Sequence, residues 1–334
     1  MKIEYIYRPP SDMVSIEKCF NNIISAISHN NVTVRKSFVK TFRCLPITIL
    51  YNIIRYAFKS RSNTIFHITG DVQYVACLMR SRNTVLTVHD CVVLHDNTAN
   101  KLYKWLVYYL WYYLPLKRLK YVCCISEETK RDLISFFPWV ESKIRIIPSP
   151  VSTQFKFSPK EFNEQSPQIL HVGTRANKNL LRVISALKGI NCHLRIIGKL
   201  GQQELDLLSA SKTNYSNDFN ISDEALILEY EQSDIVSFPS LFEGFGLPIV
   251  EAQIVGRPVI TSDMEPMKTV GQGAVLVNPF SIDSIRHGFL SIINSKQLRV
   301  ECISEGLVNS KNYTSDKVAD MYYALYKTMN TNKK

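Results

Sequence analysis

The sequence lacks the residue patterns that mark several common classes of enzyme. No Asp-x-Asp pair occurs, which argues against a metal–nucleotide site built on paired aspartates. The Gly-x-x-x-x-Gly-Lys-Ser/Thr loop of P-loop ATPases is absent, as is a Gly-x-Gly-x-x-Gly fingerprint after the first expected strand. Neither a Cys-x-x-Cys pair nor a His/Cys cluster with zinc spacing is present. The sequence therefore predicts no metal and no cofactor.

Long apolar runs and a secretory signal are also missing. No uninterrupted apolar run reaches the ~20 residues of a membrane-spanning helix, and the first ten residues contain no h-region. Most of the 8 cysteines lie in apolar runs, as is typical of reduced core residues in a cytosolic protein. We therefore expect a cytoplasmic location without disulfide bonds.

Two domains are the better expectation for 334 residues of which 46% are apolar. The net charge of +11 is unevenly placed, since residues 1–160 carry 23 Lys and Arg against 10 Asp and Glu, and residues 161–334 carry 17 against 19. A basic N-terminal half indicates an anionic partner, which is a membrane surface, nucleic acid or an acidic substrate.

Short apolar runs alternate with helical patterns in both halves of the chain. The expected strands include Ile3–Tyr7, Thr84–Val88 and Tyr121–Ile125 before the polar run Ser158–Pro167, and a second series begins at Gln168. This alternation predicts an α/β fold of two doubly wound parallel-sheet domains, covering residues 1–160 and 161–312. Ligands of such sheets bind beyond the carboxyl ends of the strands, so we expect a cleft there.

Glutamates flank a glycine loop that runs from a buried strand into a helix. The stretch Phe238–Ala252 contains Glu243-Gly-Phe-Gly-Leu-Pro248 and then Glu251 in the first helical turn. Each part has an ordinary structural explanation, because a glutamate in a first turn usually only complements the helix dipole. The combination of two carboxylates with backbone N–H donors at a helix N-terminus favours a site for phosphate or sugar oxygens.

A second glycine turn carries two cations. Val172-Gly-Thr-Arg175-Ala-Asn-Lys178 reads as strand, turn and helix start. Cations are unfavourable for the N-terminus of a helix itself, which favours a functional explanation over a solvated surface turn. Arg175 and Lys178 at this place suit a diphosphate.

The first half offers a histidine and an aromatic helix. His89 ends the expected strand Thr84–Val88 and is either a structural residue or a donor or acceptor for a substrate hydroxyl. His67 supports a weaker version of the same argument, and His171 is expected to point into the sheet. Residues 101–120 combine Tyr and Trp with Lys and Arg, which is typical of an interfacial helix, although part of this helix must belong to the core.

These motifs resemble those of group 1 (family 4) retaining glycosyltransferases of the GT-B fold, in particular bacterial enzymes of lipopolysaccharide, O-antigen, capsule or exopolysaccharide synthesis. The resemblance rests on Glu243–Glu251 with Gly256-Arg-Pro-Val-Ile-Thr261, on Gly173–Leu180, and on Ile125–Lys130 and Ile147–Val151. It covers nearly all of the C-terminal half and patches of the N-terminal half. The resemblance implies that residues 1–160 bind the acceptor, that residues 161–312 bind the nucleotide sugar, and that a last helix within 313–334 crosses back to the first domain. The chain departs from the family in the loop after the first strand, which has no glycine and in which Arg8 is the candidate substitute for phosphate contact.

The resemblance implies roles for individual residues. Glu251 would hold the ribose hydroxyls, while Glu243 and the N–H groups of the Gly244–Gly246 loop would hold the donor sugar. Arg175 and Lys178 would bind the diphosphate and stabilise its charge, and His89 would contact the transferred sugar. The implied catalytic set is His89, Arg175, Lys178 and Glu243, and the implied donor-binding set is Gly173, Arg175, Lys178, Glu243, Gly244, Phe245, Gly246, Leu247 and Glu251.

The reaction that the resemblance implies is metal-independent transfer of a hexose from a nucleotide-diphosphate sugar to a glycan acceptor, which we expect to be lipid-linked, with the nucleoside diphosphate as product. The basic half would rest on the inner face of the cell membrane. Two alternatives stay open: a GT-B-shaped epimerase or phosphorylase acting on sugar nucleotides or sugar phosphates, and a binding protein whose basic half grips nucleic acid. Glu243, Glu251 and the cationic turn argue against nucleic acid as the partner.

Overall fold

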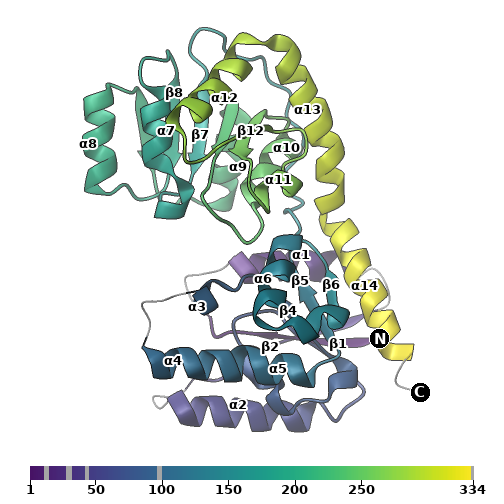
Figure 1. Ribbon diagram of the computed structural model, residues 1–334. Helices are drawn as coiled ribbons and strands as arrows, with labels where there is room; N and C mark the ends of the chain where they lie inside the picture. Colours follow the sequence, from purple (N-terminus) through teal and green to yellow (C-terminus); the bar gives the residue numbers. More distant parts are fainter. Residues whose placement is uncertain (11–14, 28–31, 42–44, 96–99, 332–334) are drawn as a thin grey trace. The chain divides into compact units, whose positions relative to one another are not determined.

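The computed structural model describes residues 1–10, 15–27, 32–41, 45–95 and 100–331. The chain forms two compact units, with Met1–Ser152 and Ser315–Lys334 in unit 1 and Thr153–Thr314 in unit 2. Figure 1 shows each unit as a sheet flanked by helices, which confirms the expected α/β class. The boundary expected at residue 160 falls inside unit 2, because the Phe157 ring lies against Gly256 and Lys160 pairs with Asp234.

Unit 1 contains a six-stranded, entirely parallel sheet of order β2-β1-β3-β4-β5-β6. The register places Tyr5 of β1 beside Lys36 of β2 and His67 of β3. The chain leaves β1 toward β2 and leaves β3 toward β4, so the strand order reverses between β1 and β3. The strands are β1 (Lys2–Tyr7), β2 (Thr33–Phe38), β3 (Ile65–Ile68), β4 (Thr84–Val88), β5 (Tyr121–Cys124) and β6 (Ile144–Ile146).

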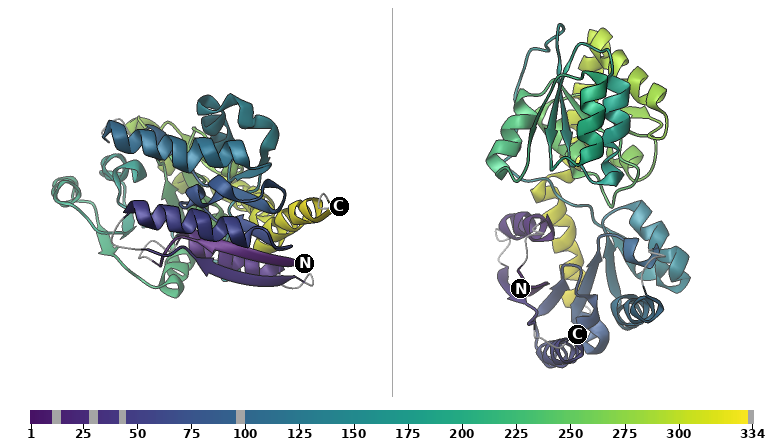
Figure 2. Two further views of the ribbon diagram at one scale, coloured as in Figure 1. Left: turned by 90° about the horizontal axis from the view of Figure 1, so that it is seen from below. Right: turned by 90° about the vertical axis from the view of Figure 1, so that its left-hand side faces the viewer.

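Helices cover both faces of this sheet (Figures 1 and 2). The segment after β3 forms a short 3₁₀ helix, η2, and the aromatic helix expected within residues 101–120 contains a π-helical segment, η4. The helical elements are α1 (Ser15–Ile27), α2 (Leu45–Lys59), η2 (Gln73–Leu78), η3 (Ser81–Asn83), α3 (Val92–His95), α4 (Lys101–Leu106), η4 (Val107–Tyr113), α5 (Leu114–Arg118), α6 (Glu127–Phe136), η5 (Pro138–Lys143) and α14 (Ser315–Thr331).

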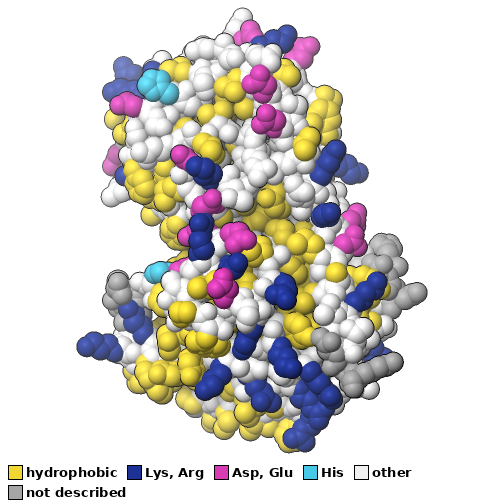
Figure 3. Space-filling model, turned by 45° about the vertical axis from the view of Figure 1, so that its right-hand side comes forward, with side chains coloured by type: hydrophobic (Ala, Val, Ile, Leu, Met, Phe, Trp, Pro, Cys, Tyr) yellow, Lys and Arg dark blue, Asp and Glu magenta, His cyan; other side chains and the backbone are white. Residues whose placement is uncertain are grey.

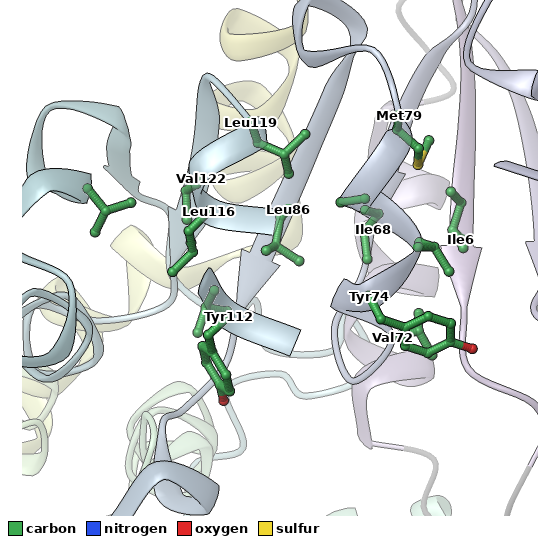
Figure 4. Packing of buried hydrophobic residues seen from close by; sticks show 14 of the residues in the cluster. Ile6, Ile68, Val72, Tyr74, Met79, Leu86, Tyr112, Leu116, Leu119 and Val122 are labelled. Carbon is green, nitrogen blue, oxygen red and sulfur yellow. The ribbon is translucent and has the colours of Figure 1, made fainter. Parts of the chain in front are cut away.

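Alternate residues of the unit 1 strands enter two separate cores, as expected when a sheet is buried on both faces. Figure 4 shows the first core, in which Leu86 and Val122 of the sheet face Leu116 of α5. The second core joins Tyr5 and Val85 to α1 and to one face of α14. The last helix is therefore part of the fold of unit 1.

Unit 2 contains a second six-stranded parallel sheet, of order β12-β11-β10-β7-β8-β9. The strands are β7 (Gln168–Val172), β8 (His193–Ile197), β9 (Tyr215–Asp218), β10 (Ile235–Phe238), β11 (Val259–Ser262) and β12 (Val275–Val277). The helical elements are η6 (Ala176–Lys178), α7 (Leu180–Leu187), α8 (Gln202–Ser211), α9 (Asp223–Gln232), α10 (Leu247–Val255), α11 (Met267–Val270), α12 (Ile282–Asn294), α13 (Lys296–Ser310) and η7 (Lys311–Tyr313).

None of the helices in the described parts of the chain has both the length and the apolar character needed to cross a lipid bilayer.

Candidate active site

The point where the strand order of unit 2 reverses lies between β7 and β10. The chain leaves β7 toward β8 and leaves β10 toward β11, on opposite sides of the sheet. Doubly wound sheets bind their ligands at the carboxyl ends of the two strands that flank this point. Both glycine loops singled out in the sequence lie there, since Gly173 follows β7 and the Glu243 loop follows β10.

Gly173 makes room for the side chain of Lys178. Its φ of +96° is a left-handed conformation, and a Cβ at this position would lie 2.9 Å from Cγ of Lys178. The Lys178 stem therefore folds over the glycine backbone, and its ammonium group lies 4.5 Å from the centroid of the Phe238 ring. The turn after β7 thus holds Lys178 against the end of β10.

Lys178 and Glu243 form an ion pair that joins the two loops. Nζ of Lys178 donates to Oε1 of Glu243 at 2.7 Å, and Nδ2 of Asn177 donates to the same oxygen at 3.2 Å. The side chains of Lys178 and Glu243 are 19% and 15% exposed, so water screens this pair less than a surface ion pair. Both donors converge on Oε1, and neither of them bonds Oε2.

Two asparagines, which the sequence analysis did not identify, brace the loops against each other. Asn177 also donates to the carbonyl of Phe242, and its own carbonyl accepts from the N–H of Leu241. Asn179 has a left-handed φ of 65° and donates to the carbonyls of Pro239 and Pro279. Asparagine tolerates this conformation better than most residues. The sequence Asn-Lys-Asn in a turn was therefore the signal from which a left-handed residue could have been predicted.

Arg175 is exposed at the tip of the turn, before η6. Its neighbour Thr174 donates from Oγ1 to the carbonyl of Lys199, which ties the turn to the loop after β8. A guanidinium that is held on a fixed turn and open to solvent can meet an incoming anion at little desolvation cost.

The second loop ends at the N-terminus of α10. Gly246 has a φ of +104° and precedes Leu247 and Pro248, the first residues of the helix. Phe245 is buried against Tyr313, with ring centroids 5.4 Å apart, which fixes the loop between Gly244 and Gly246. The partial positive charge of the helix N-terminus favours an anion or a sugar oxygen at this place.

Glu251 is held by a buried tyrosine that the sequence analysis missed. The hydroxyl of Tyr230 in α9 donates to Oε2 of Glu251 at 2.7 Å. Burial and the Glu251 charge raise the pKa of Tyr230 well above its ordinary value, so the phenol keeps its proton and remains a donor. The partner lies on another helix, 21 positions earlier in the chain, and no local pattern marks it.

His171 has no place in this site. It is fully buried in β7, and burial lowers its pKa to about 3. Its Nδ1 lies 3.4 Å from the hydroxyl of Ser237 in β10, which confirms the expectation that it points into the sheet.

The carboxyl ends of β3 and β4 in unit 1 place His89 beside a glycine. A Cβ on Gly70 would lie 2.7 Å from the His89 ring, so only glycine fits there. Nε2 of His89 donates to the carbonyl of Thr69 at 2.7 Å, and burial lowers the pKa of the imidazole. The ring is therefore neutral near pH 7 and presents Nδ1 as an acceptor for a hydroxyl.

His67 and Arg8 are committed to partners within unit 1. His67 bonds Tyr326 of α14 through Nδ1 at 2.5 Å and Thr87 through Nε2 at 2.7 Å, and burial lowers its pKa to about 3. Arg8 pairs with Glu17 at 2.9 Å and with Asp71 at 2.6 Å. His67 is thus a structural residue, whereas a phosphate contact from Arg8 would have to compete with two carboxylates.

Unit 1 also carries an exposed apolar and basic surface, which we call the docking face: Leu45, Ile47, Leu50, Ile54 and Phe58 of α2, Leu78 of η2, and Leu102, Tyr103, Trp105 and Leu106 of α4. The η2 turn packs against both α2 and η4, so it links the exposed side chains of α2 to the helical segment that continues α4. Residues 18–70 contain eight Lys and Arg and residues 97–126 contain five, with no Asp or Glu in either stretch. Figure 3 shows Lys and Arg scattered among apolar side chains over unit 1.

The described residues of unit 2 thus combine two cations, two carboxylates and two helix N-termini around one point of a parallel sheet. Such a set can bind a diphosphate and the hydroxyls of sugars. No group of three His, Cys, Asp or Glu side chains that could hold a metal ion occurs within the described ranges.

Models of two glycosyltransferase families match adjacent parts of the chain. The model described as "Glycosyl transferases group 1" matches residues 152–307, and "Glycosyltransferase Family 4" matches residues 26–155. The first match contains Arg175, Lys178, Glu243 and Glu251, and the second contains His89.

Curated relatives are similar over parts of their lengths. The O-antigen chain mannosyltransferase RfbU of Salmonella typhimurium is 26% identical over 59% of this chain and 57% of its own. A UDP-Gal:alpha-D-GlcNAc-diphosphoundecaprenol alpha-1,3-galactosyltransferase of Escherichia coli is 25% identical over 86% and 79%. The chain spans 29%, 42% and 57% of the lengths of three mannosyltransferase relatives.

Among solved structures, Anabaena Alr3699/HepE in complex with UDP and glucose superposes with a TM-score of 0.75 at 13% identity, over 98% of this chain and 100% of that one. This similarity establishes the fold.

Proposed function

We propose, from the premise that the chain belongs to the group 1 (family 4) glycosyltransferases of the GT-B fold, that it transfers a hexose from a nucleotide-diphosphate sugar to a lipid-linked glycan with retention of anomeric configuration. The pathway we infer is bacterial surface polysaccharide synthesis, since the names of several relatives specify O-antigen chains. One relative's name specifies UDP-galactose and a diphosphoundecaprenol-linked acceptor.

The observation that carries this proposal is the Lys178–Glu243 pair at the point where the strand order of unit 2 reverses. Two glycine loops and two helix N-termini would add little to the stability of a purely structural ion pair. A bound diphosphate, in contrast, would be stabilised at this place by Lys178, by the exposed Arg175 and by the dipoles of α7 and α10.

Different residues would then bind different parts of the nucleotide sugar. Arg175 and Lys178 bind the diphosphate, and Glu243 with the Gly244–Gly246 backbone binds the hexose. Glu251, oriented by Tyr230, accepts hydrogen bonds from the ribose hydroxyls. His89 of unit 1 accepts a hydrogen bond from a hydroxyl of the transferred sugar.

The chemistry requires no metal in this proposal. The bond between C1 of the hexose and the phosphate oxygen breaks while the acceptor oxygen bonds C1 on the same face, and the acceptor proton passes to the departing phosphate. Arg175 and Lys178 stabilise the charge that grows on the nucleoside diphosphate. Glu243 and Glu251 act as hydroxyl-binding groups, with no acid–base role.

We further infer that unit 1 rests on the inner face of the cell membrane through the docking face. Phe58 is 62% exposed and Leu102 is 66% exposed, and exposed apolar helices of this kind insert at the level of lipid headgroups. The surrounding Lys and Arg complement an anionic leaflet, where each is worth about 1 kcal/mol. A lipid-linked acceptor would be reached from such a surface.

Thermal melting of the purified protein with a panel of nucleotide sugars tests the proposal. We expect one nucleotide sugar to raise the melting temperature, because a ligand that binds only the folded state stabilises it. Transfer from that donor should fall in Glu251→Ala and in Arg175→Ala, and undiminished transfer in both variants would contradict the site assignment. Turnover without any acceptor glycan would point instead to an epimerase or phosphorylase.

A further inference from the structure

A cavity of about 440 Å³ opens in unit 1 beside His89. Its polar lining comes from Asp71, Gln73, His89 and Asp90, and its aromatic lining includes Trp111 and Tyr112. All of these residues belong to unit 1, at the carboxyl ends of β3 and β4 and on the helical layer above them. The size suits one or two sugar rings.

The aromatic wall is held rigidly. Nε1 of Trp111 donates to the carbonyl of Asp71 at 2.9 Å, and its ring packs on Tyr74 with centroids 4.7 Å apart. Val107, Trp111 and Tyr112 belong to the π-helical segment η4, whose wider turn brings positions i, i+4 and i+5 to one side. Such segments are rare and often occur at functional sites. The fixed indole offers a flat, electron-rich face to the polarised C–H groups of a sugar ring.

The polar wall consists of acceptors. Asp71 and Asp90 are carboxylates, and neutral His89 presents Nδ1 as an acceptor. Gln73 is 6% exposed, and its Oε1 has no partner among the described residues. A buried unpaired oxygen is costly, so the wall is suited to a ligand rich in hydroxyl donors.

The cavity contrasts with the donor site in its charge. None of its described lining residues is a Lys or Arg, and Asp71 of the lining is bonded at 2.6 Å by Arg8, which lies outside the lining. A phosphate or carboxylate placed here would face two carboxylates with no free cation. The lining therefore favours an uncharged ring and disfavours an acidic one.

We propose that this cavity binds the terminal sugar of the acceptor and selects an uncharged hexose over a uronic acid or a phosphorylated sugar. The ring stacks on Trp111, and its hydroxyls donate to Asp90 and Gln73, while Nδ1 of His89 serves the transferred sugar. Asp71 orients Trp111 through its carbonyl. The identification of this sugar as part of the acceptor rests on the proposed function, but the binding of a neutral sugar can be measured without any reaction.

Trp111 supplies the probe for that measurement. The other two tryptophans, Trp105 and Trp139, are 56% and 43% exposed, so the double variant Trp105→Phe/Trp139→Phe keeps Trp111 as the single fluorophore. We expect saturable change in its emission with at least one neutral methyl glycoside, tested with those of mannose, galactose and N-acetylglucosamine. Methyl glucuronide should bind at least tenfold more weakly. No saturable response to any neutral glycoside, or equal affinity for the uronide, would overturn the proposal.

Variants separate this inference from the proposed function. Asp90→Asn and Trp111→Ala should each weaken glycoside binding about tenfold and raise the KM for the acceptor, with the KM for the nucleotide sugar unchanged. Glu141→Gln, an exposed carboxylate on η5, is the matched control. Unchanged acceptor KM in an active Asp90→Asn variant would defeat the cavity assignment alone. Glycoside binding in a wild-type protein that transfers no sugar would defeat the proposed function alone.

Discussion

The two units contain sheets of the same size and parallel character, yet they expose different chemistry at the carboxyl ends of their strands. Unit 2 places Arg175 and Lys178 on the glycine turn after β7, beside Glu243 of the second loop, whereas unit 1 gathers Asp71, Asp90 and a tryptophan at its cavity. Outside these sites the charge is reversed, since residues 1–160 are strongly basic and residues 161–334 are slightly acidic. The local charge at the edge of each sheet is thus distinct from the net charge of the unit that carries it.

The largest effect should come from the cations of unit 2. Replacement of Lys178 by Ala removes one group that stabilises the departing diphosphate and should lower kcat about 10²–10³-fold. His89→Ala removes one neutral hydrogen bond and should cost about tenfold. Steady-state kinetics measures both, with Lys188→Ala at the other end of α7 as a control expected within twofold of wild type. A larger loss of kcat in His89→Ala than in Lys178→Ala would contradict the assignment of charge stabilisation to unit 2.

His67 in unit 1 and His171 in unit 2 are both buried, but they should contribute differently to the free energy of unfolding. His67 bonds both Tyr326 and Thr87, whereas Nε2 of His171 has no partner among the described residues. His67→Leu should therefore destabilise unit 1 by about 3 kcal/mol, because it leaves two buried hydroxyls without this partner. His171→Leu in unit 2 should cost less than about 1 kcal/mol.

Urea unfolding followed by tryptophan fluorescence tests this difference, because all three tryptophans belong to unit 1. The midpoint should fall in His67→Leu and stay near wild type in His171→Leu, whose effect is read from circular dichroism. Equal shifts in the fluorescence midpoint would show that the bonds to Tyr326 and Thr87 contribute no stability.

Acid should destabilise both units through the same histidines. Burial lowers the pKa of His67 and of His171 to about 3, whereas the unfolded value is about 6.5. The unfolded chain thus binds more protons below pH 6.5, so stability is full above that pH and falls as the pH drops toward 3. Each histidine should cost about 2 kcal/mol at pH 5. Urea midpoints at pH 7 and pH 5 measure this loss, which should be smaller in His171→Leu.

We expect the docking face of unit 1, and no surface of unit 2, to bind lipid vesicles. Phe58→Asp in α2 should weaken binding to vesicles of anionic phospholipid about tenfold, since it removes an inserting side chain and adds a repelled charge. Val308→Asp in α13 of unit 2, at a position 66% exposed, is the matched control and should bind like wild type. Flotation at low and high salt gives the readout, and equal losses in the two variants would exclude a specific face on unit 1.

The smallest effect concerns a residue that never meets the ligand. Tyr230→Phe removes the hydrogen bond that orients Glu251 and should raise the KM for the nucleotide sugar about fivefold, with kcat nearly unchanged. A donor lacking the ribose 2′-hydroxyl should show a smaller difference between variant and wild type. Equal KM values for both proteins with the natural donor would leave Tyr230 as a core residue only.

Sequence patterns predicted the fold and the loops because these depend on local rules. The strand Thr84–Val88 is confirmed as β4, because an apolar run of that length must be buried. The edge strand β9, Tyr215–Asp218, was missed since its sequence is polar and carries no apolar run. The helix expected from Asn177 begins at Leu180, because Asn179 adopts a left-handed conformation.

The side-chain contacts of the candidate site could not be predicted in this way. Glycine turns and charged residues at strand ends placed Lys178 and Glu243 in the right loops. Their direct pairing depends on the adjacency of β7 and β10, whose paired residues Ile169 and Ile235 are 66 positions apart in the chain. Tyr230, Asn179 and the cavity beside His89 depend on contacts between distant elements in the same way. The roles assigned to the predicted site residues stay predictions until the variants are measured.

The docking of α14 on unit 1 has a consequence for synthesis on the ribosome. Val318, Tyr322 and Tyr326 complete the second core of unit 1 and are translated after the whole of unit 2. Domains usually fold in the order of their synthesis, but here the second unit to be translated is the first whose chain is complete. The second core of the nascent first unit therefore stays incomplete, with α1 but not α14 on that face of the sheet, until Tyr326 emerges to reach His67.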